Sequence, residues 1–197
     1  MGYDRRHEEI GDDDMKQIPT AWNSERLFIS DLKEAEIFDI QSIVDTSNYV
    51  QEWDGRDHEP DYVRMCFEKG NLPPGGKLEN YRIQTIRTNE ENKSIGVLSL
   101  YHGYPMEDSV YLEFLYIHSE IQKQGYGQEM MQALNRLFSE LGYKEIRINV
   151  ALKNWPALRF WTKSGFDQIS GIYGDREHSD NTFANMELIK TFKKHDV

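Results

Sequence analysis

Residues 122–127 read Gln-Lys-Gln-Gly-Tyr-Gly, and they join a predicted strand that ends near Ile117 to a predicted helix. A helix N-terminus presents free backbone N–H groups and a partial positive charge, and both attract anions. Glycines let the backbone approach such an anion and adopt dihedral angles that other residues avoid. The stretch therefore predicts a site for a phosphate or pyrophosphate group at this turn.

Two common nucleotide-binding motifs do not match the turn. A Rossmann fingerprint requires a third glycine three residues after Gly127, and Met130 stands there. A Walker A loop requires Gly-Lys followed by Ser or Thr, which the stretch lacks. On these residues alone, a glycine-softened turn without any ligand remains an alternative.

Strand and helix patterns surround the turn on both sides. Alternating apolar residues predict strands over residues 80–88, 93–102 and 109–118, close enough in sequence to pair antiparallel. After the turn, apolar residues recur at helical spacing up to Gly142, and residues 144–152 again resemble a strand. Strand, helix and strand in this order predict a right-handed crossover between two parallel strands.

The remaining elements complete a single α/β (α+β) domain. Further strands are predicted over residues 25–30, 166–173 and 182–188, and further helices after Asp31, over 62–69 and after Asn154. Asp31 with Glu34 resembles a capping box at the start of the first helix. We expect a mixed, mostly antiparallel central sheet of about 6–7 strands flanked by helices. Residues 1–20 are expected to form a disordered acidic extension, and residues 21–197 the domain.

Composition excludes several classes of function. The formal net charge of −11 argues against nucleic acid, which is bound by clustered Lys and Arg. This charge would suit a cationic substrate, or it serves only solubility. No apolar run is long enough to cross a membrane, and the charged N-terminus is not a signal peptide. The single cysteine forms no internal disulfide, so a cytoplasmic location is the default.

A second block of residues gives the turn its context. It reads Asn154-x-x-Ala157-x-x-Phe160-Trp161-x-x-x-Gly165-Phe166. With residues 115–120 and the turn, this block resembles the coenzyme A signature of the GNAT N-acetyltransferase superfamily. The resemblance is sharp over residues 111–166 and architectural elsewhere, and the opening residues 24–27 also resemble the start of such enzymes.

The resemblance implies that the chain binds acetyl-CoA as co-substrate and needs no metal. In the family, backbone amides of the turn hold the pyrophosphate, and the strand before it pairs with the pantetheine arm. The cofactor-binding residues implied here are Leu115, Tyr116, Ile117, Gln122, Lys123, Gln124, Gly125, Tyr126, Gly127, Gln128, Asn154, Phe160 and Trp161. Asn154 also suits a plain helix cap, which is compatible with that role.

Glu113 is the candidate general base. An acceptor amine is mostly protonated at neutral pH, so a base must take its proton before attack. Glu113 interrupts an apolar strand, and family members often carry a glutamate near this place. If its side chain points with Leu115 and Ile117, it lies near the thioester, and burial raises its pKa. The alternative is an exposed strand glutamate without a catalytic role.

The general acid is left open, because Trp161 stands where the family usually carries a tyrosine. An indole N–H donates a hydrogen bond but is no proton donor at neutral pH. Tyr126 or Tyr173 would substitute, water would protonate the thiolate, or the thiolate would leave unaided. Trp161 would then pack against the pantetheine arm.

The expected function is transfer of the acetyl group to a primary amine of an unidentified small molecule, peptide or protein, by direct attack in a ternary complex. Family acceptors usually contact the first helices and the late strands, here residues 46–58 and 172–182. Two other classes stay open: a catalytically degenerate acyl-CoA-binding module, and a plain interaction domain. A homodimer is a tendency of the family.

Overall fold

The computed structural model describes residues 17–192 of the chain. Its strands are β1 (Ala21–Asn23), β2 (Leu27–Asp31), β3 (Tyr81–Thr88), β4 (Ser94–His102), β5 (Ser109–Ile117), β6 (Glu145–Ala151), β7 (Gln168–Gly174) and β8 (Ala184–Thr191). The α-helices are α1 (Ile37–Asp45), α2 (Gln51–Asp54), α3 (Tyr62–Lys69), α4 (Tyr126–Glu140) and α5 (Trp155–Lys163). Short 3-10 turns are η1 (Glu34–Glu36), η2 (Asn48–Val50), η3 (Leu78–Asn80) and η4 (Ser119–Ile121).

One mixed sheet of eight strands runs in the order β1-β2-β3-β4-β5-β6-β8-β7. All neighbours pair antiparallel except β5 and β6, which are parallel and are connected through α4. The predicted fold class and the parallel pair are confirmed. The sheet has one strand more than the seven segments predicted, because β1 spans three residues and is too short to show a period.

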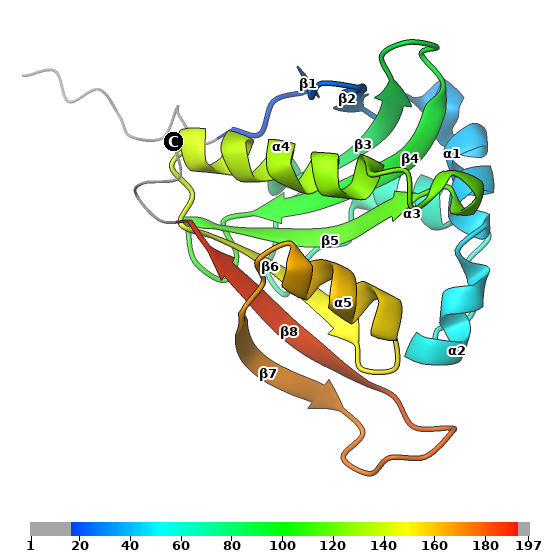
Figure 1. Ribbon diagram of the computed structural model, residues 1–197, viewed down its shortest axis with the longest axis vertical. Helices are drawn as coiled ribbons and strands as arrows, with labels where there is room; N and C mark the ends of the chain where they lie inside the picture. Colours follow the sequence, from blue (N-terminus) through cyan, green and yellow to red (C-terminus); the bar gives the residue numbers. More distant parts are fainter. Residues whose placement is uncertain (1–16, 193–197) are drawn as a thin grey trace, which may run out of the picture.

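Helices cover the sheet on both faces (Figure 1). On one face α4 and α5 pack on the sheet, and α4 buries Met130, Leu134 and Phe138 there. On the other face α1 and α3 form a second core with Val97 and Tyr101 of β4. β4 is buried along most of its length because its alternate residues enter the two cores. Both faces of the sheet are thus covered near its centre, where β4 pairs with β5.

The expected cap at Asp31 is wrong. Asp31 still belongs to β2 and pairs with Gln84, so its backbone is extended and its carboxylate accepts from Arg82 Nη1 at 2.7 Å and Gln84 Nε2 at 2.8 Å. The helical segment begins at Glu34, and its cap is Lys33, whose N donates to Glu36 Oε2 at 2.9 Å. Asp31 therefore forms hydrogen bonds with side chains of the neighbouring strand β3 and does not cap the helical segment.

Most of the acidic extension expected over residues 1–20 lies in residues 1–16, outside the described part. Of the described residues 17–20, Ile18 is buried in the core under α4, and the carbonyl oxygen of Pro19 accepts from Gln84 Nε2 at 2.8 Å. Packing against the sheet thus starts before residue 21.

We predict that Phe138→Ala destabilises the protein by about 3–5 kcal/mol, because it leaves a cavity under α4. Phe38→Ala is the control of identical chemistry, since Phe38 is 81% exposed on α1 while Phe138 is fully buried. The control should change the free energy of unfolding by less than about 0.5 kcal/mol. Urea unfolding of both variants measures the difference, and equal losses would contradict the packing described for α4.

Candidate functional site

Backbone pairing between β5 and β6 stops halfway along β5. The parallel ladder runs from Ser109 opposite Glu145 to Leu112 opposite Ile148, whereas β5 continues to Ile117 paired with β4 alone. In Figure 1 the two strands separate towards their carboxyl ends. The edge of β5 over residues 113–117 is therefore free to pair with an extended ligand, as a sheet edge does with a strand.

A bulge lies at the same point of β5. Ser99 of β4 pairs with Phe114, but the next β4 residue, Leu100, pairs with Leu112, so Glu113 has no partner in β4. A bulge inserts one residue into a strand and interrupts the alternation of its side chains. Glu113 is thus unpaired towards both neighbouring strands, at the residue where β5 and β6 part.

The bulge decides which face Glu113 occupies. Leu115 and Ile117 pack in the core under α4, but the Glu113 carboxylate meets Asn71, the second residue after α3. The expected orientation of Glu113 with Leu115 and Ile117 is therefore wrong, because the extra residue shifts the alternation. Glu113 lies on the face of α1 and α3.

The Glu113 side chain is partly buried. Asn71 Nδ2 donates to Glu113 Oε2 at 3.0 Å. Burial raises the pKa of Glu113 to about 7, so its carboxyl group is divided between both protonation states near neutral pH. Burial is also the main cause that raises the pKa values of Tyr62 and Tyr111, and the charge of Glu113 raises them further. This combination of partial burial and a near-neutral pKa suits proton transfer.

The glycine-containing turn carries a row of backbone N–H groups without partners among the described residues. Lys123 and Gly125 have φ angles of 65° and 89°. Within residues 17–192, the backbone N–H groups of residues 123–128 donate no hydrogen bond. Gln122 Nε2 donates to the carbonyl oxygen of Ile117 at 2.8 Å, which ties the turn to the end of β5. Free amides at the start of α4 fit a pyrophosphate.

A close helix contact brings α5 to this turn. A Cβ added at Gly127 would lie 3.2 Å from the ring of Phe160, so a larger residue would require this ring to shift by a few tenths of an ångström. Asn154 caps α5, and its Oδ1 accepts from Ala157 N at 3.1 Å. The cap expected at Asn154 is confirmed, whereas its contact with a cofactor stays a prediction.

Trp161 is a packing residue in this structure. Its ring makes edge contacts with Phe160 and Phe166, at centroid distances of 4.8 and 5.3 Å. Tyr126 lies under Arg26, and Tyr173 lies on the edge strand β7 and is 55% exposed. Within the described residues, neither tyrosine forms a hydrogen bond with Glu113.

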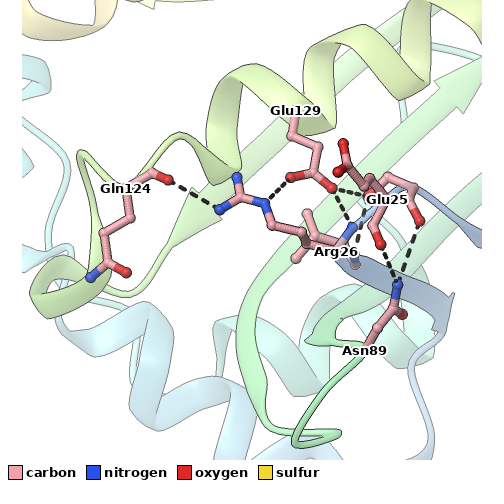
Figure 2. Close-up of polar contacts among 7 residues, drawn as sticks. Glu25, Arg26, Asn89, Gln124 and Glu129 are labelled. Atoms are coloured by element: carbon pink, nitrogen blue, oxygen red, sulfur yellow. Dashed lines mark hydrogen bonds and ion pairs between the residues drawn. The ribbon is translucent and has the colours of Figure 1, made fainter.

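Sequence reasoning missed the contact that holds the turn from outside. Arg26, directly before β2, places its guanidinium 4.4 Å from the ring centroid of Tyr126, and its Nε donates to Glu129 Oε2 at 2.6 Å. Its Nη1 reaches the carbonyl oxygen of Gln124 at 3.4 Å (Figure 2). Ser24 Oγ donates to Glu129 Oε1 at 2.6 Å. The opening stretch 24–27 resembles the start of family members, but this resemblance does not indicate a contact with α4.

The sequence also did not reveal a cluster of charged side chains on β6 and β8. Arg147 bridges Glu145 and Glu187, at 2.6 and 2.9 Å, and Tyr111 Oη donates to Glu187 Oε2 at 3.2 Å. Arg147 and Glu187 share their face with Asn149, which follows Ile148 at the last β5–β6 pair and is exposed. Polar side chains therefore extend from Tyr111 of β5 across β6 and β8.

The first segment expected to contact the acceptor, residues 46–58, contacts the residue directly after the second, residues 172–182. A Cβ added at Gly55, which follows α2, would lie 2.5 Å from the ring of Phe183, which precedes β8. Lys153 Nζ lies 4.3 Å from the centroid of the same ring. The loop after α2 and the loop between β7 and β8 are therefore joined beside the carboxyl end of β6.

Residues 17–192 contain neither a metal-binding cluster nor a membrane-spanning helix. No three His, Cys, Asp or Glu side chains in this range are grouped to hold a metal ion. No helix in the same range has the length and apolar character needed to span a bilayer.

Comparisons with known proteins identify a family and a fold. The model of the acetyltransferase (GNAT) family matches residues 44–166. The spermidine N-acetyltransferase from Vibrio cholerae in complex with CoA and spermine has a TM-score of 0.61 and 14% identity, over 84% of this chain and 95% of that one. A GNAT-family acetyltransferase from Bacillus anthracis has a TM-score of 0.64 and 17% identity, over 87% and 98%.

A third similar structure is the ribosomal-protein-S5-alanine acetyltransferase from Vibrio fischeri, with a TM-score of 0.62 and 14% identity over 88% of this chain and 97% of that one. At these identities the likeness concerns the fold. Curated protein sequences give no match.

Glu129 provides a test of the contact between α4 and the segment of Ser24 and Arg26. Burial alone would raise its pKa, but hydrogen bonds from Ser24 Oγ and from the backbone and guanidinium of Arg26 outweigh burial and lower it. A carboxylate with a lowered pKa stabilises the fold above its unfolded pKa, and this stabilisation is lost as the pH falls. We predict that Glu129→Gln lowers the Tm at pH 7 by about 1–3 °C, and that this difference shrinks below about pH 4.

The control is Glu140→Gln, at the exposed end of the same helix. It should leave the Tm nearly unchanged across this pH range. Thermal melts between pH 3 and pH 8 measure both variants. An equal Tm for Glu129→Gln and the wild type at pH 7 would show that the anchor contributes nothing to stability.

Proposed function

Because the chain belongs to the acetyltransferase (GNAT) family, we propose that it transfers the acetyl group of acetyl-CoA to a primary amine by direct attack in a ternary complex. Its enzyme class is that of the family, an acyltransferase. The observation that carries the proposal is the coincidence of three features. A turn with free amides lies beside the point where β5 leaves β6, and a carboxyl group with a near-neutral pKa stands at that point.

The first part of the proposal is the acetyl-CoA site. The free N–H groups at the start of α4 would hold the pyrophosphate, and the unpaired edge of β5 would pair with the pantetheine amides. The residues assigned to this site are Leu115, Tyr116, Ile117, Gln122, Lys123, Gln124, Gly125, Tyr126, Gly127, Gln128, Asn154, Phe160 and Trp161. A free backbone amide of β5 would also polarise the thioester carbonyl, as an oxyanion hole does.

The second part is the role of Glu113 as the general base. The acceptor would approach from the face of α1 and α3, where the Glu113 carboxylate lies, while the acetyl-CoA turn belongs to α4. Glu113 takes the proton of the amine, the amine nitrogen bonds to the thioester carbon, and the carbon–sulfur bond breaks. The thiolate leaves without a tyrosine at position 161, and water protonates it. Because Trp161 offers no acid, an acyl-CoA-binding module without catalysis is the second candidate.

The acceptor and the assembly form the third part. A spermidine N-acetyltransferase is among the similar structures, and the net charge of −11 favours a cationic amine here too. The contact between Gly55 and Phe183 supports an acceptor site at which the loop after α2 and the loop between β7 and β8 lie together beside β6. We further propose a cytoplasmic location and a homodimer.

Release of free thiol from acetyl-CoA with a panel of amines tests the transferase directly. We expect turnover with at least one amine, and for that amine Glu113→Gln should lower kcat/KM by about 10²- to 10⁴-fold at pH 7. The wild-type rate should rise with pH through about 7, because the base must lose its own proton. Glu91→Gln, exposed in the β3–β4 turn, is the control and should keep the wild-type profile.

Coenzyme A binding without turnover on any amine would favour the binding module. Equal activity of Glu113→Gln and the wild type between pH 6 and pH 9 would remove Glu113 as the base.

Two glycines at opposite ends of α4 test the cofactor turn. Gly125 and Gly142 both have positive φ angles, 89° and 77°, so alanine causes similar backbone strain at either position. We predict that acetyl-CoA raises the Tm of the wild type and of Gly142→Ala alike, because Gly142 faces open space far from the turn. Gly125→Ala should lose most of this shift, since it changes the path of the free amides. Equal shifts in both variants would place the cofactor elsewhere.

A further inference from the structure

Asn71 is exposed, but the residues on both sides of it are packed. It follows Gly70, whose φ of 69° ends α3, and a Cβ added at Gly70 would lie 2.7 Å from Leu72 Cδ2 and 3.0 Å from Tyr81 Cδ1. Leu72 packs against the second core, under α1 and α3. The residues on both sides of Asn71 are therefore fixed, and its side chain is directed to the bulge of β5.

When Glu113 is ionised, Asn71 and Glu113 can form their hydrogen bond in only one direction. A carboxylate only accepts hydrogen bonds, so Asn71 must present its amide NH₂ group, and its Nδ2 lies 3.0 Å from Glu113 Oε2. Within the described residues, Glu113 Oε1 has no hydrogen-bond partner. One carboxylate oxygen is thus anchored and the other is free for a proton.

We propose that Asn71 is a positioning residue for acetyl transfer, which anchors one oxygen of Glu113 so that the other faces the acceptor amine. The proposal rests on the proposed function, and it adds a residue that no motif in the sequence assigns. The bulge leaves Glu113 without strand partners on either side, so its side chain needs a support from outside the sheet. Asn71 provides this support from the segment that follows α3.

Asn71 also bears on the charge of Glu113. A hydrogen bond to a carboxylate favours the ionised form and opposes the effect of burial. The titratable groups that interact electrostatically with Glu113 are Tyr62 and Cys66 from α3 and Tyr111 from β5. Charged groups around them are Arg56 and Glu59 before α3, Arg147 from β6 and Glu187 from β8. Burial raises the pKa values of the two tyrosines and the cysteine, so these groups stay neutral near pH 7. Arg147 is paired with Glu187, which leaves Asn71 as the neighbour that contacts Glu113.

Asn71→Leu tests the proposal, because leucine has a similar size and cannot donate. With an amine that the wild type acetylates, we expect kcat to fall about 5- to 50-fold at pH 7. The pH at which kcat/KM reaches half of its maximum should rise by about 0.5–1.5 units. Asn71→Gln, which retains the amide, should recover part of both effects.

A double variant separates positioning from a merely structural role. If Asn71 acts through Glu113, adding Asn71→Leu to Glu113→Gln should change the rate by less than about 2-fold. Full additivity of the two losses would overturn the proposal. So would an unchanged rate and pH profile of Asn71→Leu.

A direct titration keeps this proposal distinct from the transferase assignment. Carbon-13 NMR of the glutamate carboxyl groups, with Glu113 assigned by the loss of its signal in Glu113→Gln, follows the pKa of Glu113 without any turnover. A higher pKa in Asn71→Leu than in the wild type supports the contact, and an equal pKa overturns it. A wild-type enzyme that acetylates no amine would instead remove the proposed function, whatever the titration gives.

Discussion

The interruption of backbone pairing after Leu112 is the constraint on which the rest of the site depends. A parallel pair inside a sheet normally continues along both strands, because an unpaired N–H or C=O group in a dry environment is costly. Here β5 loses β6 after the pair of Leu112 with Ile148, and it loses β4 for one residue at the bulge. The free edge that results needs a partner, and an extended pantetheine arm with its own amides is the partner we propose.

The same interruption sets the positions of the reacting groups. Because the bulge adds one residue, Glu113 moves to the face of α1 and α3, while Leu115 and Ile117 return to the core under α4. The turn at the start of α4 then lies on one side of the sheet and the carboxylate on the other. In the proposed mechanism this arrangement lets cofactor and acceptor enter from opposite faces and meet at one residue. Arg26 contacts Glu129 and Tyr126, and these contacts hold the first turn of α4 against the start of β2.

Local patterns in the sequence predicted what depends on neighbours along the chain. Helical spacing, the glycine turn and the cap at Asn154 are local features, and the structure contains each of them. The strand before the turn was also correctly placed, since it is an apolar run interrupted only by Glu113. The parallel pair followed from the order of strand, helix and strand.

The features that were missed depend on partners far apart in sequence. Glu113 was found by its charge in an apolar strand, but its face depends on a one-residue shift against β4, which no periodicity reveals. Asp31 was taken for a cap, because the side chains that claim it, Arg82 and Gln84, lie on another strand. Asn71 and Arg26 sit in irregular segments, so nothing in their surroundings indicates Glu113 or Glu129 as partners.

A crystal structure of the protein with coenzyme A bound tests the central claim most directly. The account predicts pyrophosphate oxygens within about 3.2 Å of backbone nitrogens in residues 123–128. It predicts pantetheine amides paired with β5 beyond Leu112, and the sulfur at the level of Glu113. A cofactor bound elsewhere, or a pantetheine arm that leaves this edge of β5 unpaired, would contradict it.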